Sequence, residues 1–384
     1  MIRTENYISR PDRSSRRIAY PYDAFVFTSA ETLGYLCNIS LYDEFMDAEA
    51  SIEAYRKGEP ILAELFEGVD VIAPVTTPII KYGHMNSVGV PLIFPKTGQV
   101  ALDMKQTDLS EVLKILKKPC DFLGGLTPFH VEYLKKMRQA FPGRRVHWGW
   151  QSEGPVTTIW GLAGNDAMYG VYDEPELFRE CMDAVIDSLV GYTKFYCQID
   201  GTAVMDPFPD HGRICDDIAA MFSPALWGEF VLPYWKRFMD EAPVPSRKIH
   251  CEDMKKSHLG LLDSLNLEDY DPGISPFLNP QMIADSTDTP FCWRLGSFLY
   301  PQMSEEMCHD FAIQAAVDGA QYTFTAIEPM MCTPEIIRKI RAYYDGAMEV
   351  RKALIEGSSR SDLKKLLHGC HDDAYWDNWA GFRK

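Results

Sequence analysis

Residues 247–274, RKIHCEDMKKSHLGLLDSLNLEDYDPGI, contain the repeating pattern on which the fold prediction rests. The stretch KIHCE (248–252) has the apolar character of a short strand, HLGLLDSLN (258–266) has helical spacing, and YDPGI (270–274) is a second short strand. Two strands joined by one helix form a right-handed parallel crossover. The segment therefore predicts one strand–helix–strand unit of a parallel sheet.

The same alternation extends along most of the chain. Further strands are expected at 69–77, 144–150, 201–206, 291–296 and 322–328, and helices at 175–197, 223–241, 305–319 and 334–354. Roughly seven or eight such units favour a (β/α)8 TIM barrel, because a doubly wound sheet would want an early G-x-G-x-x-G motif, which is missing. We expect an N-terminal arm with a helical extension (1–68), a barrel domain (69–356) and a C-terminal tail (357–384).

The composition limits the class of partner. A formal net charge of −17 over 384 residues argues against nucleic acid and is compatible with a basic partner protein or a small neutral ligand; a solvated acidic surface also explains it. Ten cysteines occur singly, as in a reduced compartment. The N-terminus lacks an apolar signal-peptide core, and no stretch approaches the roughly 20 apolar residues of a membrane span. We expect a cytoplasmic protein; a homodimer is compatible with the sequence.

The strongest candidate site combines His250, Glu252 and Cys332. Side chains two residues apart on a strand share one face, so His250 and Glu252 are expected to lie together, while Cys251 turns to the other face. Cys332 follows the end of a later strand, and strand ends of one barrel meet at the same rim. Imidazole, carboxylate and thiolate make a three-ligand zinc site with an open position. The alternative is that His250 and Glu252 are a hydrogen-bonded polar pair and that Cys332 is a small buried residue.

Three other strand ends carry candidate side chains. Asp206 ends the expected strand at 201–206 and Asp217 follows in the next loop; both could accept a substrate hydroxyl or orient a metal ligand, and loop solvation and helix capping explain them as well. Trp293 with Arg294 suits a planar, partly anionic ligand such as an aromatic carboxylate, although a structural arginine is an equal reading. Trp150 stands at a strand end before a Gly-Pro turn. The chain lacks G-x-S-x-G, P-loop and H-E-x-x-H motifs.

Taken together, these segments resemble the uroporphyrinogen decarboxylase superfamily of (β/α)8 barrels. The pieces that carry the resemblance are SEGPVTTIWGLAG (152–164), the helix after 173–176, CDDIAAMFSPALWGEFVLPYW (215–235), IHCED (249–253) and MMCTPEIIRKI (330–340). The resemblance extends over roughly residues 60–350. It implies the barrel fold and leaves the branch of the superfamily to be decided by the site residues.

Two branches of the superfamily are to be weighed. The decarboxylases bind their substrate through an arginine-rich N-terminal loop, which SSRRIAYPYDAF (14–25) does not resemble. Zinc-dependent methyltransferases of corrinoid pathways have His-x-Cys and a later cysteine before Thr-Pro. His250 and Cys332 match that pattern, and Glu252 replaces the middle cysteine. One thiolate with one carboxylate leaves zinc a stronger Lewis acid than two thiolates do, which suits cleavage of an inert methyl–oxygen bond.

The resemblance therefore implies a methyltransferase that demethylates a methoxylated aromatic compound. Its methyl acceptor would be a corrinoid (cobalamin) carried by a separate protein, with Trp150 or Trp293 against the substrate, and zinc or an acid such as Asp217 activating the ether oxygen. Three alternatives remain open: a methylcorrinoid:thiol methyltransferase of the coenzyme M type, a uroporphyrinogen decarboxylase, and a barrel without catalysis that binds a corrinoid partner.

Overall fold

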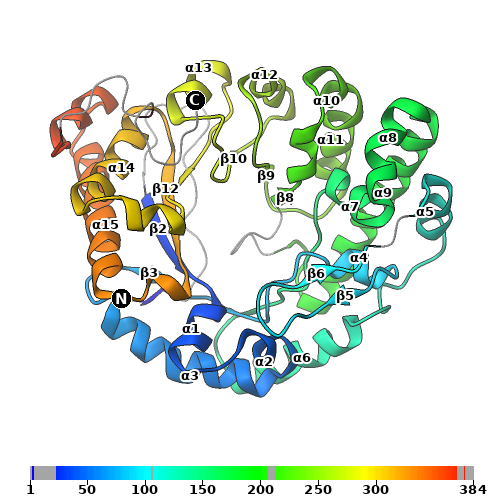
Figure 1. Cartoon of the computed structure of the whole chain (residues 1–384), viewed down its shortest axis with the longest axis horizontal. Helices are drawn as coiled ribbons and strands as arrows, with labels where there is room; N and C mark the ends of the chain where they lie inside the picture. Colours follow the sequence, from blue (N-terminus) through cyan, green and yellow to red (C-terminus); the bar gives the residue numbers. More distant parts are fainter. Residues whose placement is uncertain (1, 4–22, 105–106, 206–212, 370–375, 377–384) are drawn as a thin grey trace. The chain divides into compact units, whose positions relative to one another are not determined.

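The computed structural model describes residues 2–3, 23–104, 107–205, 213–369 and 376 (Figure 1). They fall into two compact units. Unit 1 consists of Met1–Asn38, Ala54–Ala73 and His250–Lys384, and unit 2 consists of Ile39–Glu53 and Pro74–Ile249. The boundary between them passes through the end of strand β9 (Lys248–His250).

A parallel sheet organises unit 1. Its strand order is β1-β3-β2-β12-β11, with bounds β1 Ile2–Arg3, β2 Asp23–Thr28, β3 Val71–Ile72, β11 Trp293–Arg294 and β12 Tyr322–Ile327. β2 and β12 lie side by side along their whole length (Figure 1). β10 (Asp269–Asp271) lies beside the segment that precedes β11, to which it is joined by a parallel bridge from Tyr270 to Phe291. The first long strand thus neighbours the last, which is the relation found in a closed ring of parallel strands.

β2 was not among the strands that we expected from the sequence. Its residues DAFVFT form one short run without a paired turn signal, and they precede a region with clear helical spacing. In the structure Ala24 and Val26 are fully buried because β2 is a central strand. The parallel sheet therefore already includes residues 23–28, ahead of the expected barrel start at residue 69, and the domain division itself stays a prediction.

Helices in unit 1 follow the strands as expected. They are α1 (Ala30–Leu36), the later part of α3 (Ala48–Leu65), α12 (Lys256–Leu259), α13 (Pro280–Ser286), α14 (Glu305–Val317) and α15 (Pro334–Ile355), with 3-10 turns η3 (Gly260–Leu265), η4 (Ser297–Gln302), η5 (Pro329–Met331) and η6 (Arg360–Leu366). Ser304 caps the first turn of α14, and Thr333 caps that of α15. α15 crosses α14 at Gly346, where a side chain would overlap the carbonyl oxygen of His309.

Unit 2 contains shorter strands between longer helices. The strands are β4 (Val75–Thr76), β5 (Leu92–Ile93), β6 (Ala101–Leu102), β7 (Val146–His147), β8 (Arg213–Cys215) and most of β9; the helical elements are α2 (Leu41–Met46), α4 (Gly83–Ser87), α5 (Leu109–Leu116), α6 (Thr127–Ala140), α7 (Pro155–Ala163), α8 (Asn165–Asp173), α9 (Pro175–Asp200), η2 (Asp217–Met221), α10 (Pro224–Phe230) and α11 (Leu232–Glu241). β4 and β7 pair in parallel. The strand expected at 201–206 is wrong, since residues 201–205 form no strand and β8 begins at Arg213.

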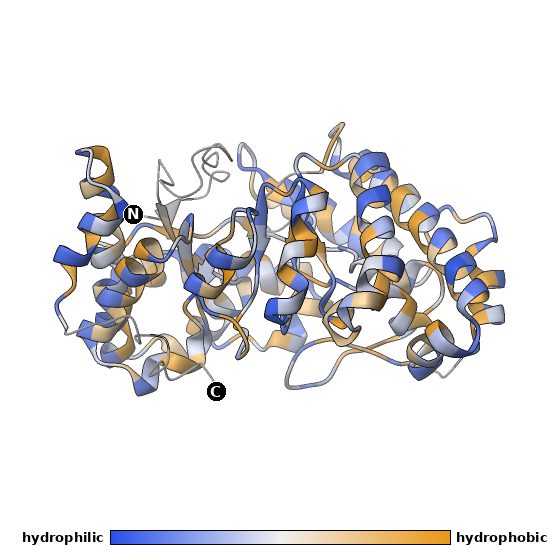
Figure 2. Ribbon diagram, turned by 90° about the horizontal axis from the view of Figure 1, so that it is seen from above, coloured by the Kyte–Doolittle hydropathy of each residue, from blue (hydrophilic) through white to orange (hydrophobic). Residues whose placement is uncertain are grey.

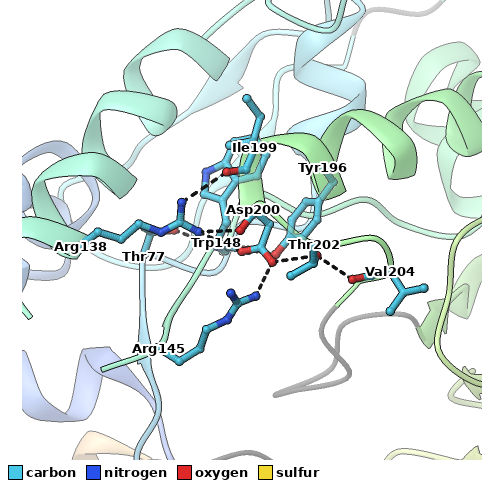
Figure 3. Close-up of polar contacts among 10 residues, drawn as sticks. Thr77, Arg138, Arg145, Trp148, Tyr196, Ile199, Asp200, Thr202 and Val204 are labelled. Atoms are coloured by element: carbon cyan, nitrogen blue, oxygen red, sulfur yellow. Dashed lines mark hydrogen bonds and ion pairs between the residues drawn. The ribbon is translucent and has the colours of Figure 1, made fainter. Parts of the chain in front are cut away.

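A cluster of ion pairs joins the C-terminal end of α9 to the residues just before β7 (Figure 3). The buried carboxylate of Asp200 pairs with Arg138, 3.1 Å from Nη2 to Oδ1, and with Arg145, which directly precedes β7. Thr202 donates to the same carboxylate at 3.2 Å, and α9 ends at Gly201 in the left-handed conformation. This cluster lies at the amino end of a strand, where residues of a barrel contribute to stability.

The helices carry polar and apolar residues along the same ribbon, as expected of helices with one buried face (Figure 2). Within the described part of the chain, no helix combines the length and the apolarity that crossing a lipid bilayer requires.

Candidate functional site

His250 and Glu252 lie at the carboxyl end of β9, as the sequence predicted. Ile249 and Cys251 are fully buried on one face of the chain. His250 and Glu252 alternate to the other face, where their side chains are 16% and 36% exposed. Both residues belong to unit 1. A strand end with two partly exposed ligand-type side chains is where a barrel enzyme carries its chemistry.

A third residue, Asp271, orients the imidazole of His250. Asp271 ends β10, its carboxylate is 5% exposed, and its Oδ2 is 3.0 Å from Nδ1 of His250. The N–H of Gly273 donates to the other carboxylate oxygen at 2.9 Å. An Nδ1–H that donates to a carboxylate leaves the lone pair on Nε2, which is the tautomer of a metal-ligating histidine. Asp271 was not predicted as a site residue, although it lies within the expected strand YDPGI (270–274).

The carboxylate of Glu252 lies on the Nε2 side of the ring. Its Oε1 is 3.8 Å from Nε2, too long for a hydrogen bond. Ligand atoms on a tetrahedral zinc ion lie roughly 3.4 Å apart, given bond lengths of about 2.1 Å, so the pair fits an ion between them. Gly273, at φ +62°, leaves room for Glu252, because a Cβ there would overlap its carboxylate. Asp253 has φ +60°, a strained conformation for a non-glycine residue that clusters at functional sites.

The structure does not gather Cys332 with this pair. Among the described residues, the group of three His, Cys, Asp or Glu ligand atoms within 4.8 Å of one another is a different one, His309, Glu349 and His368. Burial raises the pKa of the Cys332 thiol to about 11, so the thiol is protonated at neutral pH. A zinc ion would favour the thiolate. His250 and Glu252 thus fit the predicted metal site, and Cys332 as its third ligand stays a prediction.

Arg294 and Glu328 lie at neighbouring strand ends of unit 1, and the charge of Arg294 acts on Glu328. Arg294 ends β11 with its guanidinium over the ring of Phe324, 5.7 Å from the centroid. Glu328 follows β12. Burial raises its pKa, the charge of Glu31 raises it further, and the charge of Arg294 opposes both. Arg294 was predicted from the sequence and Glu328 was not; the only signal for Glu328 was its place at the end of an expected strand.

The structure places both predicted substrate tryptophans in the packing. Trp293 is 4% exposed, and its ring meets that of Trp376 edge to face at 5.8 Å. Trp150 is fully buried; its indole N–H donates to Thr127 at 3.0 Å, and its ring stacks on His130 at 3.9 Å. Neither ring offers a face to a ligand in this arrangement.

Two acids of unit 2 differ in their surroundings. Asp217 is exposed at the start of η2, and its charge is one of the causes, after burial and Glu153, that raise the pKa of Tyr82. Asp216 is fully buried and accepts hydrogen bonds from the N–H groups of Val156 and Thr157 at the start of α7, and from the Trp235 indole. Burial raises its pKa to about 6 despite these donors. The predicted Asp206 lies outside the described residues.

Comparisons with known proteins agree with the fold. A family model described as uroporphyrinogen decarboxylase (URO-D) matches residues 82–268. The solved structure of a methyltransferase from Methanosarcina mazei is similar with a TM-score of 0.60, covering 88% of this chain and 97% of that one at 18% sequence identity. No curated protein sequence matches the chain. The match confirms the expected α/β class, a (β/α)8 barrel of the uroporphyrinogen decarboxylase type.

Proposed function

We propose that this chain, which belongs to the uroporphyrinogen decarboxylase superfamily, is a zinc-dependent methyltransferase that takes the methyl group of a methoxylated aromatic compound. The methyl acceptor is the cobalt of a corrinoid bound to a separate protein. The observation that carries the proposal is the cluster of His250, Glu252 and Asp271 at the carboxyl ends of β9 and β10. The name of the similar Methanosarcina protein supports a methyl-transfer function for this fold.

His250 through Nε2 and Glu252 through its carboxylate would hold the zinc, with Cys332 as the third ligand. When bound, the ion supplies a Lewis acid for the ether oxygen of the substrate. The chain's contribution is to place the ligands: Asp271 holds the imidazole in one tautomer and one orientation, and Gly273 leaves room for the Glu252 carboxylate beside it. A pair fixed in advance costs no reorganisation when the substrate binds.

Arg294, whose charge acts on Glu328, suits recognition of the substrate. The guanidinium of Arg294 rests on Phe324, so its donors keep a defined direction. An aromatic carboxylate would meet Arg294 in a bidentate fashion and compete with Glu328 for it. Because the charge of Arg294 lowers the pKa of Glu328, neutralising that charge with a substrate carboxylate would favour protonation of Glu328 and remove a repelling charge. We assign substrate binding to Arg294 on this basis; a catalytic role for Asp217 stays a prediction.

The experiment that tests the proposal measures zinc and methyl transfer together. Purified protein, wild type and Glu252→Ala, is assayed anaerobically with reduced cobalamin and a panel of methoxybenzoates, and its zinc is measured by elemental analysis. The variant should lose both the zinc of this site and the demethylation. Full activity with unchanged metal content in the variant would refute the site.

The family match keeps porphyrinogen decarboxylation as a second candidate, since the model that matches residues 82–268 is described by that activity. A decarboxylase of this superfamily needs no metal, so a catalytic dependence on zinc separates the two functions. A thiol methyltransferase would differ by its acceptor, and an assay with coenzyme M and methylated cobalamin identifies it.

A further inference from the structure

We propose that His309, Glu349 and His368 form a second metal site, which binds one zinc-type transition ion and fastens the segment after η6 to α14 and α15. One ligand atom from each residue lies within 4.8 Å of the other two. All three residues belong to unit 1. The inference is independent of the proposed function, because none of the three is part of the strand-end cluster.

His309 is the centre of the group. Its side chain is 6% exposed, and its Nδ1 is 2.8 Å from Oδ1 of Asp310. Nε2 is buried, has no hydrogen-bond partner among the described residues, and lies 3.5 Å from Oε2 of Glu349. A histidine that donates Nδ1–H to a buried carboxylate and directs an unpaired Nε2 at a second carboxylate has the form of a metal ligand with its supporting acid.

The packing of two helices brings Glu349 to this place. Gly346 allows α15 to approach the backbone of α14 at His309. Glu349 follows Gly346 by three residues, so it lies on the same side of α15 within one turn. Asp345 lies on that side as well, four residues before Glu349, and its pKa responds to the charges of both His309 and Glu349. The site therefore carries enough negative charge to attract a divalent cation.

Asp310 also fixes the third ligand. Its buried carboxylate accepts the backbone N–H of His368 at 3.0 Å and that of Gly369 at 2.8 Å. The ring of His368 stacks on that of His309 at 3.8 Å and 8°. Stacked rings cannot both direct a lone pair at one ion, so zinc binding would require the exposed His368 ring to turn about its side-chain bonds while its backbone stays held. Two imidazoles, one carboxylate and a water complete a tetrahedral zinc site.

The competing state is an ion pair without metal. Burial alone would lower the pKa of His309, but the hydrogen bond that it donates to Asp310 and the charges of Glu349 and Asp310 outweigh burial and raise the pKa. A protonated His309 between carboxylates would need no ion. Metal binding requires the neutral ring, so a zinc titration at pH 8 decides between the two states.

The test counts zinc ions per full-length chain. Metal-stripped protein is titrated with Zn²⁺ by calorimetry as wild type, His250→Gln, His368→Gln and the double variant, with circular dichroism as the check on folding. If both sites exist, the four proteins bind two, one, one and no ions. If only the second site exists, they bind one, one, none and none, so failure of the proposed function remains distinguishable.

Two results would overturn the second site: equal zinc binding by His368→Gln and wild type, or no zinc bound by His250→Gln. A Glu349→Gln variant repeats the measurement with a ligand from α15, and its side chain is 46% exposed, so folding tolerates the change. Zinc should raise the thermal midpoint of His250→Gln and leave that of the double variant unchanged, because an ion that binds only the folded chain stabilises it.

Discussion

His250 and His309 have closely similar surroundings in different parts of unit 1. Each directs Nδ1 at a buried aspartate, Asp271 at 3.0 Å or Asp310 at 2.8 Å, and each has Nε2 toward a glutamate at 3.8 or 3.5 Å. His250 ends a strand, whereas His309 lies within α14 against α15 and the C-terminal segment. The same donor set therefore occurs at a strand end and between helices.

The difference between the two clusters lies in their place in the fold. The strand-end cluster is accompanied by the strained Asp253 and by Gly273, and strand ends of a barrel carry its chemistry. The helix cluster joins elements that are far apart in the sequence, and its acid Asp310 binds the backbone of the segment it fastens. Ligand type alone thus does not assign a role, and we expect catalysis at one cluster and stability at the other.

The largest expected effect is the loss of methyl transfer in Glu252→Ala. Removal of a carboxylate that holds the Lewis acid should lower kcat/KM by about 10²–10³-fold. The matched control is Glu268→Ala, an exposed glutamate directly before the amino end of β10, which should retain the wild-type rate. Equal rates for the two variants in the cobalamin assay would contradict a catalytic role of the strand end.

The buried carboxylate of Asp216, which accepts hydrogen bonds from N–H groups, is a point of comparison for the two clusters. Burial raises its pKa to about 6 from 3.8, so the folded chain binds more protons than the unfolded chain between these values. Its contribution to stability should therefore fall as pH rises from 4 to 7, by roughly 2 kcal/mol relative to Asp216→Asn.

Urea unfolding of Asp216→Asn and wild type at both pH values measures this difference. A difference that does not change with pH would mean that the three N–H donors keep Asp216 ionised in the folded chain.

Asp271→Asn should have a smaller effect than loss of Glu252, because it changes only the support of a ligand. We expect zinc affinity and methyl transfer to fall by about 10- to 100-fold. Competition with a zinc-binding dye measures the affinity. If the asparagine variant binds zinc as tightly as wild type, the orientation of His250 does not depend on this carboxylate.

The smallest effect belongs to the helix cluster. In the His250→Gln background, saturating zinc should raise the thermal midpoint by a few degrees, since a ligand at 100 times its Kd adds about 2.7 kcal/mol. The additional change His368→Gln should abolish the rise. Differential scanning calorimetry at fixed zinc gives both values, and an equal rise in both proteins would place the ion elsewhere.

The sequence predicted what depends on local spacing. Alternation on a strand placed His250 and Glu252 together, and repeated strand–helix units indicated the barrel class. Asp271 was missed because its contact depends on the register between two strands. Trp150 and Trp293 were expected beside a ligand, but both rings pack against other side chains. The local sequence does not show which face of a short strand the helices cover. The helix cluster needs three elements and a close approach at Gly346, which no local pattern reveals.

The central claim is tested most directly by the products of one anaerobic reaction. Zinc-loaded protein, reduced cobalamin and a methoxybenzoate should yield methylated cobalamin and the corresponding hydroxybenzoate in equal amounts, and chelation of zinc should stop the reaction. Absence of both products from zinc-loaded wild-type protein across the methoxybenzoate panel, together with decarboxylation of a porphyrinogen that chelation does not affect, would contradict the account.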